Sequence, residues 1–239
     1  MTVGLTPAAR QGISVGLATG TYGVSFGALS VAAGLSVPQT CALSLLMFTG
    51  GSQFAFVGVV AAGGAGAAAA ATAALLGTRN MLYSLQLAPL LGLARGKGGA
   101  ARRTGLLRPL AAQLTIDESA AVAFAQADRD EQRRGFWVTG LAVYALWNAF
   151  TLAGALAGSS LGDPRRWGLD GAAAAAFLAL LWPRLRRREA RAVGLAAAVV
   201  AAAAVPVAPA GVPVLAAAVV AAAVASFTHS SADREQVAA

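Results

Sequence analysis

Three ionisable residues stand inside otherwise apolar stretches of the chain: Arg79, Asp117 and Glu118. An ionised side chain at membrane depth costs roughly 2.5–3.5 kcal/mol on insertion scales, so such residues usually face the interior of a helix bundle and mark a transport pathway. Asp117 or Glu118 could accept a substrate ammonium group, and a buried carboxylate could also carry a coupling proton. Arg79 could donate to a substrate carboxylate.

Two other interpretations of these three residues stay open. Arg79 could pair with Asp117 or with Glu118 only to fix how the helices pack. A misplaced segment boundary would instead leave both carboxylates at the membrane interface.

The carboxylates follow a possible helix start. Thr115 precedes Glu118 by three residues, and a hydroxyl residue followed three later by Glu before an apolar run fits a capping box. Such a helix would begin near Thr115, inside the bilayer or at its edge. Its free N–H groups and the positive end of its dipole could then face a cavity and hold an anion.

A second possible interruption reads Thr-Gly-Gly-Ser-Gln over residues 49–53. Gly50 and Gly51 allow an unwound backbone and the close approach of a ligand, and Ser52 and Gln53 follow them. Many secondary transporters build their binding sites from broken helices of this kind. Tight helix packing is the alternative interpretation of the glycine pair.

Long apolar helices must position these groups. The chain has 57% hydrophobic and 12% charged residues, and its mean hydropathy is +0.66. Soluble domains carry about 25% charged residues, so lipid must cover much of this surface. Continuous apolar runs, rather than alternating ones, favour helices. We therefore predict an all-α protein, a polytopic transmembrane helix bundle that forms one domain over residues 1–239.

The apolar pattern predicts about six to eight membrane segments, some of them broken or re-entrant. They lie near residues 12–33, 40–62, 67–93, 106–127, 136–158, 168–182, 192–205 and 212–227, with tails at 1–11 and 228–239. Polar residues interrupt the second, third and fourth segments, the third at residues 77–80.

Positive charge lies in short clusters between the apolar segments, and the net charge is +8. The clusters at 95–108 and 184–191 indicate cytoplasmic loops rather than a surface for nucleic acid. An even number of crossings must separate two loops on one side of the membrane. Three candidate segments lie between these clusters, so one of them does not cross, and 106–127 is the least apolar.

Small residues recur along the first segment at helical spacing and fall on one stripe. These positions are Gly12, Gly16, Gly20, Gly23, Gly27, Ser30 and Gly34. Such a stripe lets another helix approach closely. Tyr22 and Phe26 lie beside it.

Several of these motifs together resemble the AzlC-type branched-chain amino acid permeases. Residues 25–54 carry a Phe-Gly pair, a Gly-Leu-x-x-Pro turn and a Gly-Ser-Gln-Phe element, and residues 79–84 and 117–118 resemble the family's Arg-His-x-Leu-Tyr and Asp-Glu elements. Asn80 stands where the family often has His. The resemblance implies an exporter of branched-chain amino acids such as valine in the bacterial cytoplasmic membrane. It also implies a small multi-span AzlD-type partner.

The expected substrate-binding or proton-coupling residues follow from the motifs and the resemblance, with Phe26 lining a pocket for the substrate side chain. They are Tyr22, Phe26, Gly50, Gly51, Ser52, Gln53, Arg79, Asn80, Thr115, Asp117 and Glu118. We expect proton-coupled antiport.

Three alternatives to a transporter stay open: a channel, a scaffold that stabilises a partner, and an intramembrane serine protease that uses Ser52 and His229. We expect no enzyme activity, no cofactor and no metal site, because the chain has one His and one Cys.

Overall fold

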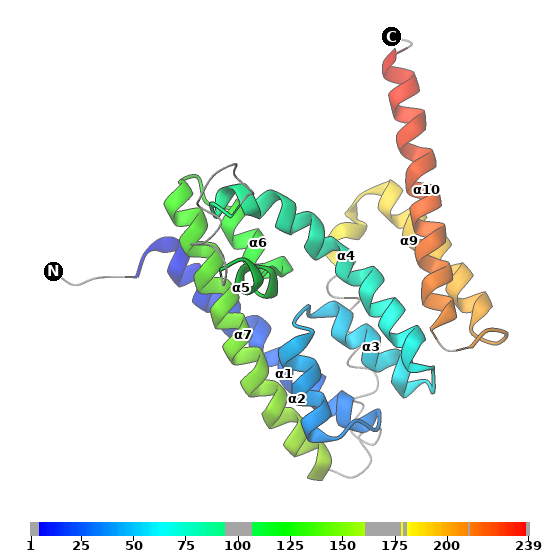
Figure 1. Ribbon diagram of the computed structural model, residues 1–239. Helices are drawn as coiled ribbons and strands as arrows, with labels where there is room; N and C mark the ends of the chain where they lie inside the picture. The colour runs from blue at the N-terminus through cyan, green and yellow to red at the C-terminus, as the bar shows by residue number, and fades with distance from the viewer. Residues whose placement is uncertain (1–4, 94–106, 161–177, 179–180, 210, 238–239) are drawn as a thin grey trace.

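The computed structural model describes residues 5–93, 107–160, 178, 181–209 and 211–237, and this part of the chain is all-helical (Figure 1). Its helices are α1 (Pro7–Ala32), α2 (Val37–Leu46), α3 (Gly51–Ala61), α4 (Gly66–Leu90), α5 (Leu107–Gln113), α6 (Asp117–Phe124), α7 (Arg129–Ser160), the short 3-10 helix η3 (Trp182–Arg186), α9 (Arg188–Ala204) and α10 (Val212–Val237). Most of the predicted segment 168–182 lies outside the described residues.

Helices α1 and α7 pack side by side along their whole length (Figure 1). They run parallel, because Gly12 contacts Thr139 near the start of α7 and Gly27 contacts Ala155 near its end. The glycine stripe predicted in the first segment makes this contact at five positions, Gly12, Gly16, Gly20, Gly23 and Gly27. Gly34 does not belong to the stripe. It lies beyond the end of α1 with φ +93°, in the turn that leads to α2.

Helices α2 and α3 form the first hairpin, residues 37–61. Ser36 begins α2 with a capping box to Gln39. Helix α2 begins a short turn after α1 ends, at the side where α1 meets the end of α7, and Phe48 just past α2 packs edge to face on Tyr144, nearer the middle of α7. Helix α2 therefore runs antiparallel to α7, and α3 returns beside α4 to the side from which α2 came.

Helices α5 and α6 form the second hairpin, residues 107–124, which comes from the opposite side. Gln126, just past α6, contacts Gln11 near the start of α1, and Arg133 near the start of α7 donates to the Leu90 carbonyl at the end of α4. Hence the second hairpin begins and ends at the side where α4 ends. The predicted interruption of segments 40–62 and 106–127 is confirmed.

The tips of the two hairpins meet. The Gln113 amide, at the end of α5, donates to the Leu45 carbonyl near the end of α2 at 2.8 Å, and the Tyr144 hydroxyl donates to the same carbonyl at 3.3 Å. Helices α2 and α3 have 10 and 11 residues, about 15 Å each, roughly half of a bilayer core. The broken segments therefore place free helix ends near the centre of the bundle.

The helices differ from the bounds expected from the sequence at three places. Residues 77–80 do not interrupt the third segment, because α4 is continuous from Gly66 to Leu90. Thr6 caps α1 and Pro7 starts it, so the expected N-terminal tail is partly helical. At the other end, α10 extends to Val237 through the expected polar tail.

Two of the described helices, α1 and α7, are long and apolar enough to cross a membrane. The predicted number of six to eight membrane segments stays a prediction. Helices α9 and α10 pack mainly against each other, and α9 has no buried residue. The core lies instead among α1, the two hairpins and α7.

Candidate functional site

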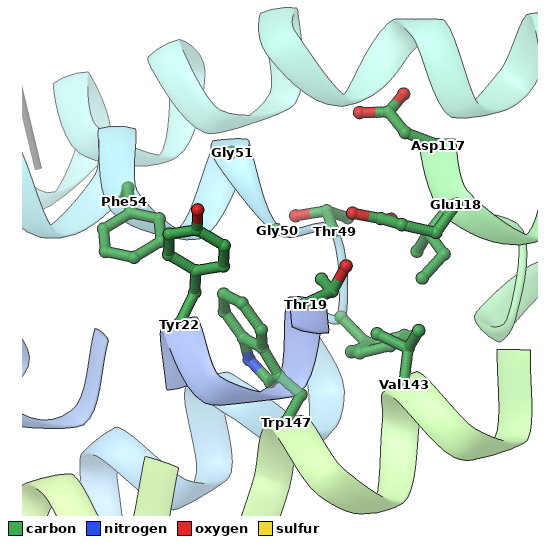
Figure 2. A pocket seen from close by; sticks show the side chains of 12 residues that line it. Thr19, Tyr22, Thr49, Gly50, Gly51, Phe54, Asp117, Glu118, Val143 and Trp147 are labelled. Atoms are coloured by element: carbon green, nitrogen blue, oxygen red, sulfur yellow. The ribbon is translucent and has the colours of Figure 1, made fainter. Parts of the chain in front are cut away.

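A cavity of about 200 Å³ lies where the hairpin tips meet α1 and α7. Figure 2 shows carboxylates at one end and aromatic rings at the other. The lining residues are Thr19, Tyr22, Phe48, Thr49, Gly50, Gly51, Phe54, Ile116, Asp117, Glu118, Val143 and Trp147. The cavity is smaller than the roughly 300–1,000 Å³ typical of sites for drug-sized ligands, so its size suits a small molecule.

Arg79 joins the two hairpin tips. Its Nη1 lies 3.0 Å from Oδ2 of Asp117, and its Nη2 donates to the Thr49 carbonyl at 3.4 Å. Asp117 is the first residue of α6, and Thr49 lies in the break between α2 and α3. The predicted ion pair of Arg79 therefore forms with Asp117, and both side chains keep 30% of their exposure.

Glu118 lies beside this ion pair in the first turn of α6. Its side chain lies beside Thr19 of α1, and both residues line the cavity. Figure 2 shows the Glu118 side chain directed across the cavity toward Thr49, above Thr19. The two neighbouring carboxylates thus have different neighbours.

The break in the first hairpin depends on Gly50 and Gln53. Gly50 has φ +63°, a backbone conformation that favours glycine. The Gln53 side chain accepts from the Gly50 N–H at 3.1 Å and donates to the Leu43 carbonyl at 3.3 Å. Gln53 therefore holds the end of α2 to the start of α3, and its amide group is used by the backbone rather than directed into the cavity.

Aromatic and aliphatic side chains form the apolar end of the cavity. The rings of Phe54 and Trp147 meet edge to face at 6.0 Å, and Val143 lies one turn before Trp147 on α7. The expectation that Phe26 lines this pocket was wrong. Phe26 is fully buried and packs behind the wall, stacked on Trp147 at 5.8 Å and edge to face with Phe54 at 5.6 Å.

Five other expected site residues do not line the cavity: Arg79 and Gln53, described above, and Ser52, Asn80 and Thr115. The Thr115 hydroxyl donates to the Ala111 carbonyl, so Thr115 does not cap α6. Ile116 is the N-cap residue instead, and the Ser119 hydroxyl accepts from the Ile116 N–H at 3.1 Å. Ser52 and Asn80 stand outside the lining as well, and each has a buried oxygen with no hydrogen-bond partner within the described chain.

Five of the expected residues come together at the cavity: Tyr22, Gly50, Gly51, Asp117 and Glu118. The apolar and hydroxyl lining was missed by sequence reasoning: Thr19, Phe48, Thr49, Phe54, Ile116, Val143 and Trp147. Nothing in the local pattern distinguishes these residues from core residues, because the cavity forms between elements distant in sequence.

A protein-family model described as "AzlC protein" matches residues 14–161. The match includes both hairpins and every residue that lines the cavity. Comparisons with curated proteins and with solved structures found no match. The family model covers more than half of the chain, and the chain therefore belongs to the AzlC protein family.

Proposed function

We propose that this chain is the larger subunit of a transporter that exports valine-like branched-chain amino acids across the bacterial cytoplasmic membrane. Membership of the AzlC family supports a branched-chain amino acid transporter. One observation carries the proposal to this site: a small cavity with carboxylates at one end and apolar rings at the other, between two opposed broken helices. Opposed half-helices around a polar site are typical of secondary transporters.

A branched-chain amino acid matches this cavity group by group. Its ammonium has three donors and fits the carboxylate end. Its carboxylate fits the start of α3 at Gly51, where free N–H groups and the positive end of the helix dipole attract an anion. Its aliphatic side chain fits against Phe54 and Trp147.

Proton coupling fits the same carboxylate end. A carboxylate that binds an ammonium group when ionised can bind a proton when the ammonium is absent, so substrate and proton would alternate. This exchange is antiport, with amino acid leaving as protons enter. Asn80 cannot carry a proton, which directs the proposal to Asp117 and Glu118.

A small AzlD-type membrane subunit is the proposed partner. AzlC-family proteins pair with AzlD in known systems. The transporter should therefore be tested with both subunits present.

The test is efflux of labelled valine from vesicles that contain both subunits. We expect Asp117→Asn and Glu118→Gln each to reduce the efflux rate at least tenfold, because each removes a charged acceptor from the cavity. Asp130→Asn is the matched control, since Asp130 is an exposed carboxylate on α7 with 83% exposure. Rates at the wild-type level in both cavity variants would refute the assignment of the site.

The other functions separate in the same experiment. Valine flux that neither saturates with valine concentration nor depends on a proton gradient would indicate a channel. A chain that stabilises its partner subunit but carries no valine flux would indicate a scaffold. The serine protease alternative was wrong, because the AzlC family is a transporter family and not an enzyme family.

A further inference from the structure

Two neighbouring carboxylates line the cavity, but only one of them is paired. Asp117 is held by Arg79, which also donates to the Thr49 carbonyl in the first hairpin. The structure gives Glu118 no ion pair within the described chain. Glu118 lies beside Thr19 on the cavity lining. Asp117 binds Arg79 through Oδ2 while its Oδ1 has no hydrogen-bond partner within the described chain, whereas Glu118 has no cationic partner there.

The charge balance points the same way. With both carboxylates ionised, the carboxylate end carries two negative charges and Arg79 supplies one positive charge, which leaves a net charge of −1. A charge in a poorly hydrated site is costly until it is paired. One ammonium group or one proton would neutralise it. The carboxylate end therefore fits one positively charged group, such as the ammonium group of an amino acid.

Thr19 adds a second acceptor. Its hydroxyl lies beside Glu118 on the cavity lining, and the hydroxyl oxygen has lone pairs that can accept from an ammonium group. Thr19 and Glu118 come from α1 and α6, and both line the cavity. Ammonium can donate to both at once, because it has three donors.

Trp147 contributes to the apolar side of the cavity. Trp147 is 2% exposed and lines the cavity, and its indole Nε1 has no hydrogen-bond partner within the described chain. A buried N–H without an acceptor costs about 1–3 kcal/mol.

We propose that Glu118 and Thr19 form the ammonium subsite of the cavity, and that Asp117 is a positioning residue that Arg79 holds in place. The assignment rests on the proposed transport function. It predicts that Glu118 and Thr19 sense the ammonium group directly, whereas Asp117 acts through the arrangement of the hairpin tips.

Three probes separate these roles in vesicles with both subunits. Labelled valine measures transport, 2-methylpropylamine presents the ammonium group and side chain without the carboxylate, and 3-methylbutanoate presents the carboxylate without the ammonium. We expect the amine to inhibit wild-type efflux competitively. Thr19→Val should raise both the KM for valine and the inhibition constant of the amine by roughly tenfold or more, the value of one hydrogen bond to a charged group. Inhibition by 3-methylbutanoate should not change.

Thr19→Ser restores the hydroxyl and should restore the wild-type constants. Thr21→Val is the matched control, because Thr21 is exposed on the same helix and its hydroxyl bonds only to the Ala18 carbonyl. Glu118→Gln should abolish inhibition by the amine. Asp117→Asn should lower the maximal rate and keep the amine's inhibition constant within about twofold.

Two failures can be distinguished. If wild-type vesicles export no valine, the proposed function fails. If they export valine but Thr19→Val and Glu118→Gln leave the amine's inhibition constant unchanged, or Asp117→Asn abolishes amine inhibition, the division of roles is wrong and the proposed function stands.

Discussion

Replacing Arg79 by Gln should destabilise the protein through both hairpin tips at once. The change removes the 3.0 Å ion pair with Asp117 and the 3.4 Å hydrogen bond to the Thr49 carbonyl. It also leaves Asp117 beside Glu118 with no positive charge between them. Glutamine keeps much of the length of the side chain, so the loss comes mainly from the charge and its contacts.

The magnitude follows from the exposure of the pair. Breaking a fully buried ion pair costs about 3–5 kcal/mol, and losing an exposed pair costs about 0–1 kcal/mol. Both side chains here keep 30% exposure, which places the pair between these cases. We therefore expect a loss of about 2 kcal/mol. For a chain of this size, that loss lowers Tm by about 4–8 °C.

The assay is thermal unfolding in detergent of wild type, Arg79→Gln, Asp117→Asn and the double variant. The two losses should not add, because each single variant leaves the other charge unpaired, and we expect a coupling energy of about 1–2 kcal/mol. Arg187→Gln is the control, since Arg187 forms an exposed pair with Glu189 at 3.2 Å, and should cost about 0–1 kcal/mol. Additive losses for Arg79 and Asp117 would refute the coupling of the tips.

Three further predictions concern the packing and the two breaks. Gly27→Val should lower the free energy of unfolding by about 3 kcal/mol or more and abolish valine efflux, because a Cβ there would meet the Thr151 carbonyl oxygen and separate α1 from α7. Thermal unfolding measures this loss. Gly58→Ala, with open space around it, is the control and should cost less than about 1 kcal/mol. Gly50→Ala should cost about 1–2 kcal/mol and slow efflux, because it strains a positive φ of +63°; unchanged unfolding and efflux would contradict this. Gln113→Leu should lower the free energy of unfolding by about 1 kcal/mol, the value of its 2.8 Å hydrogen bond to a carbonyl of α2. It should also increase hydrogen exchange in the first hairpin, and protection at the wild-type level would show that the hairpin tips are not joined there.

Local sequence signals predicted where the helices stop. A glycine pair after Thr49 and a polar cluster after Gln113 both mark real interruptions. The polar cluster at residues 77–80 was wrongly predicted to interrupt its helix. Arg79 forms an ion pair with Asp117 of another helix, so α4 stays continuous. A polar residue inside an apolar run does not by itself tell whether its partner is solvent or another helix.

The direction of the chain after each break could not be predicted. It depends on contacts between residues far apart in sequence, such as Gln113 with Leu45 and Arg79 with Asp117. The same limit explains why the sequence predicted Phe26 at the cavity and missed Trp147. Both are aromatic residues in long apolar helices, and only the packing of α1 against α7 decides which of them reaches the cavity.

The glycine contact between α1 and α7 has a consequence for how the site can open. The five glycines bring the backbone of α1 directly against α7, so the two helices are closely packed along this contact. We therefore expect the pair to move as one rigid body. Thr19 and Trp147 belong to this body, whereas Gly51 and Glu118 belong to the hairpins. The cavity therefore lies between this helix pair and the two hairpins. For the proposed transport, we expect each hairpin to tilt against the helix pair and to expose the cavity to one side of the membrane at a time.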